Sequence, residues 1–258
     1  MLKTVELIEV LMRIWEQIGG SMNQQSPRHD ETRLANGVTP IATTIVTASS
    51  SDELSPIEAS IMDTCNALHE ARDRQDMRSI RELSEHLEKL LDRYDETDGE
   101  DHPNSAWSRA NQRALALSAM GRIDEAIRLE LVAIKYADTP RRQEISYGNL
   151  ADRCLRLGEP DRAVEFFLDA INANPESVPV LITGAHALYE AGYLEQADTI
   201  FRTLLDNAQL LTPSSELGAY LDCDVRTRNL SEVLPSLAAL YDQWAALNAR
   251  VSRQGGAG

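Results

Sequence analysis

The chain has few of the residues that hold small secreted or metal-bound domains together. Of its 258 residues only three are cysteine, Cys65, Cys154 and Cys223, and their spacing matches neither a zinc motif nor a disulfide framework. No apolar run reaches the roughly 18–20 residues of a membrane-spanning helix. Charged residues interrupt the apolar start of the chain, which therefore does not read as a signal peptide. We expect reduced thiols, no metal site, no membrane span and a cytoplasmic location.

Sequence motifs of catalysis are also missing. His69-Glu70 begins like a zinc-protease helix, but Asp73 stands where the second histidine is needed. The acidic run Asp92–Asp101 lacks the ligand spacing of a calcium loop. There is no glycine-rich phosphate loop and no nucleophile elbow. We therefore predict no catalytic residue and no cofactor, while an enzyme with an unrecognised site stays open as a further hypothesis.

The charge balance is strongly acidic. Twenty-five Lys and Arg residues stand against 41 Asp and Glu, which gives a net charge of −16. Long-range repulsion opposes binding to nucleic acid or to an anionic membrane. A partner with a basic surface is favoured instead.

What the chain does contain is a helical hairpin at Glu144–Ser177. Two apolar stripes with helical spacing are separated by Gly158-Glu159-Pro160, where a glycine ends one helix and a proline can begin the next. The first stripe is Tyr147, Leu150, Ala151 and Cys154, and the second is Ala163, Val164, Phe167, Ala170 and Ile171. Such a hairpin cannot bury all of its apolar surface alone, so it needs neighbours.

The hairpin recurs at a fixed period. Gly158 and Gly192 are 34 residues apart, as are Ala163 and Ala197, and a third copy lies upstream around Gly121. Gly121 and Gly158 are 37 residues apart, so this junction carries three extra residues within Thr139–Gln143. A period of 34 residues is typical of stacked helical repeats.

This pattern resembles the tetratricopeptide repeat family. The residues that carry the resemblance are Tyr147, Leu150, Ala151, Ala163, Phe167 and Pro175, and it extends over 107–211. The resemblance implies an all-α fold, an antiparallel helix-hairpin solenoid of about five hairpins. The expected organisation is an amphipathic N-terminal helix at 1–20, a flexible linker at 21–53, a degenerate or capping hairpin with an acidic loop at 54–102, three repeats at 103–211, a capping hairpin at 212–251 and a disordered tail at 252–258.

The predicted N-terminal helix has a broad apolar face. Its members are Leu2, Val5, Ile8, Leu11, Trp15 and Ile18. An apolar face of this size is unfavourable in water, so it must be covered. It can pack on this chain, on a second copy or on a partner; a membrane contact and a start-site artefact are the remaining alternatives.

The resemblance also implies a concave groove, lined by the first helix of each hairpin. Its expected residues are Asn111, Gln112, Leu115, Ile145, Asn149, Asp152, Arg156, Ile182, Thr183, His186 and Tyr189. Asn149 stands where such grooves often hold a peptide backbone, but it could equally satisfy a neighbouring helix. The positions of the basic clamp that binds acidic chaperone tails are occupied by Asn111, Leu115, Pro179 and Thr183, so binding of such a tail is not expected.

Two hypotheses of function follow. The first is a noncatalytic adaptor whose groove binds an extended or helical segment of another protein, with a basic segment as one option. The second is an assembly factor or chaperone-like protein, in which residues 1–20 drive self-association or occupy the groove as a gate. Fold resemblance alone does not decide between them.

Overall fold

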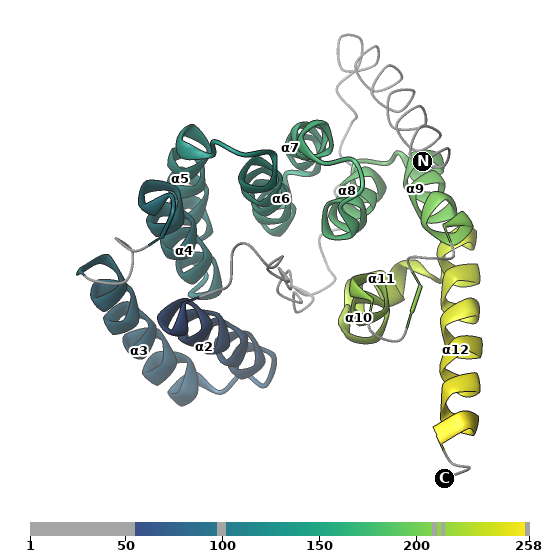
Figure 1. The fold of residues 1–258 in the computed structure, drawn as a ribbon, viewed down its shortest axis with the longest axis horizontal. Coiled ribbons are helices and arrows are strands. Elements are labelled where there is room, and N and C mark those ends of the chain that lie inside the picture. Colours follow the sequence, from purple (N-terminus) through teal and green to yellow (C-terminus); the bar gives the residue numbers. More distant parts are fainter. Residues whose placement is uncertain (1–54, 97–101, 208–210, 213–214, 256–258) are drawn as a thin grey trace. The chain divides into compact units, whose positions relative to one another are not determined.

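The computed structural model describes residues 55–96, 102–207, 211–212 and 215–255. The predicted N-terminal helix, the linker and most of the acidic loop lie outside these residues. Every regular element of the described part is a helix, and none of its residues is assigned to a strand. Figure 1 labels these helices in the order of the chain. Successive helices pack as adjacent antiparallel pairs, so the predicted all-α hairpin solenoid is confirmed.

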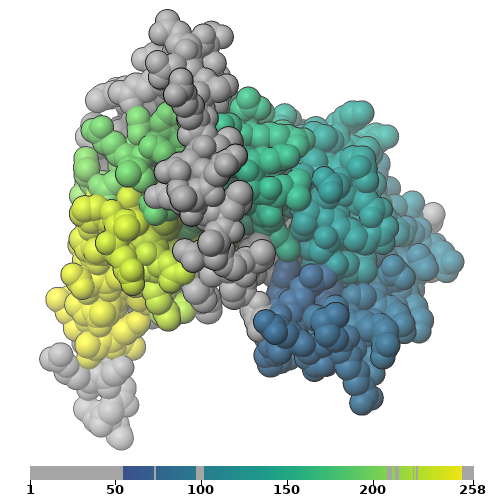
Figure 2. Space-filling model, turned by 180° about the vertical axis from the view of Figure 1, so that it is seen from behind, coloured from purple at the N-terminus to yellow at the C-terminus, as the bar shows by residue number. Residues whose placement is uncertain are grey.

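The chain divides into two compact units. The larger one, within residues 42–191, contains α2 to α8. Their bounds are α2 Pro56–Asp73, α3 Met77–Glu96, α4 Ser105–Ala119, α5 Ile123–Ala133 with the short 3₁₀ helix η3 Ile134–Tyr136, α6 Pro140–Arg156, α7 Pro160–Ala173 and α8 Val178–Glu190. In this unit the colour runs in order from blue to green, because helices that are neighbours in the sequence are neighbours in space (Figure 2).

Local sequence signals explain where these helices begin and end. Ser55 and Glu58 form a capping box at the start of α2, and Pro56 occupies its first turn. Gly121 and Gly158 close the α4–α5 and α6–α7 turns with φ angles of +83° and +73°, a conformation that strains other residues. The turn residues of the hairpins therefore act as predicted.

The first hairpin is joined to the repeats by an apolar core. Side chains of α2, α3 and α4 bury one another there: Ile57, Ile61, Cys65, Leu68, Leu87, Leu91, Tyr94, Ala116 and Ala119. The alanines of α4 let the first hairpin approach closely. The hairpin that lacks the repeat signature is thus packed like a member of the stack.

A buried hydrogen-bond network lies beside this core. The Glu58 carboxylate accepts hydrogen bonds from the Tyr94 hydroxyl at 2.8 Å, from the Ser108 hydroxyl at 2.9 Å and from the Ser55 backbone amide at 2.8 Å. Burial alone would raise the pKa of Glu58, but these hydrogen bonds outweigh burial and lower it. Three helices are therefore tied together by one charged carboxylate.

We expect this network to make stability depend on pH. Because the pKa of Glu58 is lower in the folded than in the unfolded chain, its contribution is present above its ordinary value of 4.5 and is lost as the pH falls below it. Glu58→Gln should reduce the free energy of unfolding by about 1–3 kcal/mol at pH 7. Urea unfolding between pH 7 and pH 3 tests this. A difference between the two proteins that stays constant over this range would contradict the prediction.

The smaller unit, within residues 192–258, contains α9 Leu194–Asp206, α10 Glu216–Cys223, α11 Val225–Leu230 and α12 Pro235–Gly255. The capping hairpin expected at 212–251 would have one helix in its first arm, but the structure divides this arm into α10 and α11 at Asp224. The Asp224 side chain accepts hydrogen bonds from the amides of Arg226 and Thr227, so it caps α11 and separates it from α10. Helix α12 also extends to Gly255, into the segment expected to be a disordered tail.

Helix α12 is anchored to α9 at its first turn. The Asp198 carboxylate accepts hydrogen bonds from the Ser236 amide at 2.8 Å and from its hydroxyl at 2.7 Å. A carboxylate at the start of a helix also interacts favourably with the helix dipole. In this way a polar contact, together with buried Leu237 and Leu240, orients the last helix.

Candidate functional site

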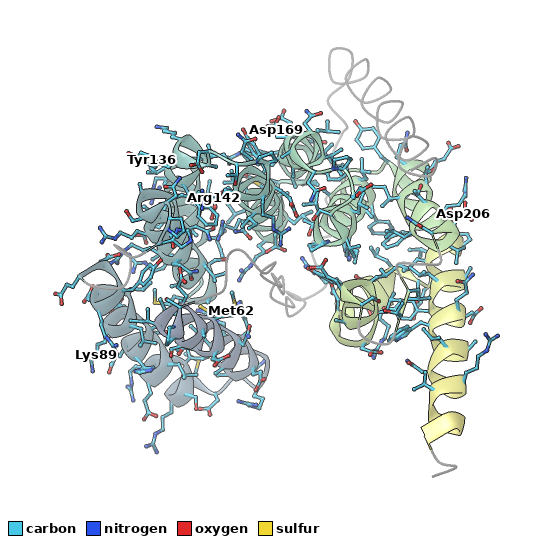
Figure 3. The ribbon with its side chains drawn as sticks, in the orientation of Figure 1. Met62, Lys89, Tyr136, Arg142, Asp169 and Asp206 are labelled. Atoms are coloured by element: carbon cyan, nitrogen blue, oxygen red, sulfur yellow. The ribbon has the colours of Figure 1, made fainter. Side chains whose placement is uncertain are left out.

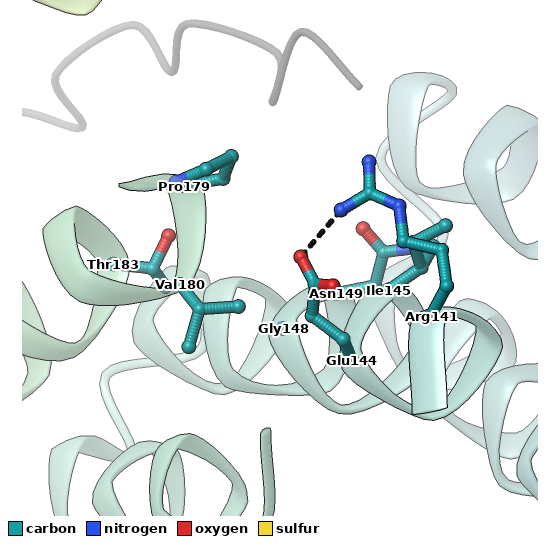
Figure 4. Close-up of a pocket in the computed structure, with 8 residues that line it drawn as sticks. All are labelled: Arg141, Glu144, Ile145, Gly148, Asn149, Pro179, Val180 and Thr183. Carbon is teal, nitrogen blue, oxygen red and sulfur yellow. Dashed lines mark hydrogen bonds and ion pairs between the residues drawn. The ribbon is translucent and has the colours of Figure 1, made fainter. Parts of the chain in front are cut away.

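A shallow pocket lies between α6 and α8, the first helices of two successive repeats (Figure 4). Its cavity volume is only about 20 Å³, because the depression is largely open to solvent. Its lining residues are Arg141, Glu144, Ile145, Gly148, Asn149, Pro179, Val180 and Thr183. Three of them, Ile145, Asn149 and Thr183, belong to the groove predicted from the sequence.

One end of the pocket is built on a buried carboxylate. Glu144 has only 2% of its surface exposed, and its carboxylate accepts a hydrogen bond from Arg141 at 2.6 Å. The Asn174 amide at 2.8 Å and the Ser177 hydroxyl also donate to this carboxylate. Arg141 is thereby held over the pocket, and its charge is balanced by that of Glu144 (Figure 4).

The rest of the pocket is mostly apolar. Pro179 and Val180 form the apolar wall on α8, while Ile145 lines the pocket on α6 and packs on the core cluster of Trp107, Ala133 and Ala137. Gly148 forms part of the floor, and a Cβ atom at this position would make an ordinary contact of 3.4 Å with Cγ2 of Val180. A pocket with these walls and few polar groups suits a small aliphatic side chain.

Asn149 connects the pocket to the preceding repeat. Its side-chain amide donates a hydrogen bond to Oδ1 of Asn111 on α4 at 3.1 Å. Asn149 therefore has the inter-helix contact that the sequence left as one of its two alternatives. It is half-buried and also lines the pocket, so it can take part in both.

The predicted residues of α4 are more buried than a free groove surface would be. Asn111 and Gln112 are 8% and 6% exposed, and Oε1 of Gln112 has no hydrogen-bond partner among the described residues. Leu115 packs on the core that joins α2, α3 and α4. These three residues line the inner side of α4 without entering the pocket.

Arg156 and Asp152 lie further along α6, near the last turn of α4. Arg156 donates hydrogen bonds to the hydroxyl of Ser118 at 2.6 Å and to its carbonyl oxygen at 3.2 Å. A cation at the C-terminal end of α4 is favoured by the helix dipole. Burial, and then the charge of Arg156, lower the pKa of His69 on α2 to about 4, while Asp152 opposes this shift. Arg156 therefore has a structural role at this helix end, and His69 is neutral at physiological pH.

The predicted groove residues of α8 differ in how far they are buried. Ile182, Thr183 and His186 are 1%, 6% and 5% exposed and belong to the buried part of the helix, whereas Tyr189 is half-buried near its end. Only Thr183 of this set reaches the pocket.

The pocket also contains residues that the repeat register did not indicate. Arg141 lies in the five-residue segment 139–143, which contains the three extra residues that break the 34-residue period. Gly148 has no side chain, and this small residue in the middle of a helix was a signal of close approach by the neighbouring helix α8. The sequence did not single out Val180, because apolar residues occur on every face of its helix.

Two further findings concern metal binding and membrane spanning. Within 55–96, 102–207 and the later described residues, no group of three or more His, Cys, Asp or Glu side chains is placed to hold a metal ion. No helix in that part of the chain combines the length and apolarity required to cross a bilayer.

A solenoid of paired helices defines the class of helical repeat proteins. Residues 145–177 match the family model described as the tetratricopeptide repeat, which confirms the resemblance found in the sequence. These repeats are typically noncatalytic and serve as scaffolds for protein–protein interaction.

Solved structures with a similar course of the chain include BtubC (BKLC) from P. vanneervenii. It is 17% identical, with a TM-score of 0.43, and the match covers 79% of this chain and 92% of that chain. A second is a Podosopora anserina kinesin light chain protein with nearly identical TPR-like repeats. It is 18% identical, with a TM-score of 0.49, and 78% of this chain and 100% of that chain are covered. Among curated proteins, no sequence matches this chain significantly.

Proposed function

We propose that the protein is a noncatalytic adaptor that binds an extended segment of a partner protein at the α6–α8 pocket. The observation that carries this proposal is the convergence of Ile145, Asn149 and Thr183 on one depression between two repeats. An aliphatic side chain of the partner rests against Pro179 and Val180. Asn149 and Thr183 then lie beside the partner backbone, where an amide and a hydroxyl can hydrogen-bond it.

The negative net charge of this chain favours a partner of positive charge. A net charge of −16 attracts a basic partner over long range, and added salt weakens this attraction. At the pocket itself Arg141 and Glu144 balance each other. We therefore propose basic residues that flank an uncharged anchor. We place this interaction in the cytoplasm, which suits the buried unpaired thiols of Cys65 and Cys154.

The test uses peptides displayed on phage, selected first for binding to the wild-type protein. Gly148→Leu should fill the floor of the pocket and reduce binding of the selected peptides about tenfold or more, since it removes the site of a buried aliphatic group worth about 1.5–3 kcal/mol. Peptides that the variant rejects should share Leu, Ile or Val at one fixed position.

Asn172→Leu is the matched control. Asn172 is exposed on α7 and outside the pocket, so this variant gains the same side chain without filling the site. Circular dichroism should show that both variants are folded. Equal binding of the selected peptides to wild type and to folded Gly148→Leu would refute the pocket assignment.

A further inference from the structure

An exposed stripe on α5 carries apolar side chains between charges of opposite sign. Asp124, Arg128, Leu131, Val132 and Lys135 follow the spacing i, i+4, i+7, i+8 and i+11, which places them on one side of the helix as it continues into η3. We call this set the α5 stripe. All five residues are exposed, Leu131 by 36% and Val132 by 38%. The apolar centre of the stripe is therefore not covered by any helix that the structure describes.

The stripe lies on the outside of the larger unit. On the opposite side of α5, Ala126, Ile127, Glu130 and Ala133 are buried. Figure 3 shows Tyr136, which is 49% exposed, at the end of the same helical segment and on the margin of this unit. No residue of the stripe lines the α6–α8 pocket, so a ligand of the stripe goes beyond the proposed function and does not depend on it.

The charges at the two ends of the stripe have no partner in the described part of the chain. Asp124 stands in the first turn of α5, and Lys135 follows it by 11 residues, or about three turns. Neither forms an ion pair with another described residue. The neighbouring charges differ in this respect, since Arg122 lies 2.6 Å from Glu125. The stripe therefore offers one unpaired anion at its start and one unpaired cation at its end.

This order of charges is complementary to itself. If two copies of α5 lie antiparallel about a two-fold axis, Asp124 of each copy stands opposite Lys135 of the other. The same register places Leu131 opposite the aliphatic part of Arg128. We propose that a second copy of this chain docks on the α5 stripe in this antiparallel arrangement, with the apolar centres in contact and an ion pair at each end.

A second copy fits this surface better than a helix with charges of one sign. Such a helix would meet a like charge at one end of the stripe, whereas an antiparallel copy meets opposite charges at both ends. Two features limit the affinity: the two Arg128 side chains come near each other at the centre, and each chain has a net charge of −16. The contact of one helix per copy is also small. We therefore expect a weak dimer that forms at high protein concentration.

Sedimentation equilibrium of the full-length protein between about 2 and 200 µM tests the proposal, since the fraction of dimer depends on concentration. The mean mass should rise above the 28.7 kDa of one chain. Asp124→Lys and Lys135→Glu should each lower the association constant about tenfold or more, because either change places like charges at both ends of the pair. An equimolar mixture of the two variants should associate as well as the wild type, since a mixed pair joins opposite charges at both ends.

Glu85→Lys and Lys89→Glu are the matched controls. Both residues are exposed on α3, so these variants change the net charge by the same amounts and should associate like the wild type. Circular dichroism should show that all variants are folded. A wild type that stays monomeric, or a mixture that associates no better than its two components, would overturn the proposal. So would association that both stripe variants retain and that deletion of residues 1–20 removes, which would assign it to the N-terminal segment.

Discussion

Gly184→Ala should destabilise the larger unit by about 3 kcal/mol, because α7 and α8 have no room for one more carbon atom. A Cβ atom at this position would lie 2.1 Å from two ring atoms of Phe167. The Phe167 ring is 1% exposed, so it cannot move aside without disturbing the core. Overpacking of this kind typically costs ~1–3 kcal/mol, and occasionally more.

The same replacement at Gly148 should have the opposite sign. A Cβ atom there would make an ordinary contact of 3.4 Å with Val180, and alanine is favoured over glycine in a helix by about 1 kcal/mol. Gly148→Ala should therefore be as stable as the wild type or more stable. Urea unfolding of both variants checks the pair. A Gly184→Ala protein as stable as Gly148→Ala would show that the α7–α8 contact is not as close as described.

Removing either partner of the Glu130–Arg153 ion pair should cost about 3–5 kcal/mol. The two side chains are 0% and 2% exposed, and Nη1 of Arg153 lies 2.6 Å from the Glu130 carboxylate. Burial raises the pKa of Glu130, while the charge of Arg153 works against this shift. Glu130→Gln would leave a buried guanidinium that cannot lose its proton, and Arg153→Met would leave a buried carboxylate without its cation.

The double variant Glu130→Leu with Arg153→Met should come within about 1 kcal/mol of the wild type, since no charge is then left buried alone. The exposed pair Arg78–Glu82 is the control, and alanine at either position should change stability by about 0.5 kcal/mol or less. Denaturant unfolding measures all of these. A double variant that is less stable than both single variants would contradict this account of the pair.

The repeated hairpins could be predicted because each carries its own local signals. Gly121 and Gly158 occupy left-handed turns that few other residues tolerate, and the apolar stripes between them have helical spacing. The break between α10 and α11 could not be predicted in the same way. Asp224 lies inside a run that reads as one helix, and only its hydrogen bonds to Arg226 and Thr227 show that it caps a new one.

The candidate site was predicted in part. The repeat register indicates Ile145, Asn149 and Thr183 because these positions recur every 34 residues on the inner helices. It missed Arg141, since the three-residue insertion breaks the period at that point. It also gave no sign that Asn149 and Asn111 are paired, because a contact between side chains 38 residues apart depends on how two helices are placed. Burial of Gln112 and His186 depends on packing for the same reason.

The most direct test of the pocket is nuclear magnetic resonance of the ¹⁵N-labelled protein during titration with one of the phage-selected peptides. The account predicts that the largest amide shifts occur at Ile145, Gly148, Asn149 and Thr183, and that Gly148→Leu abolishes them while Asn172→Leu does not. Shifts confined to α3 or α12, with the amides of α6 and α8 unchanged at saturation, would contradict it.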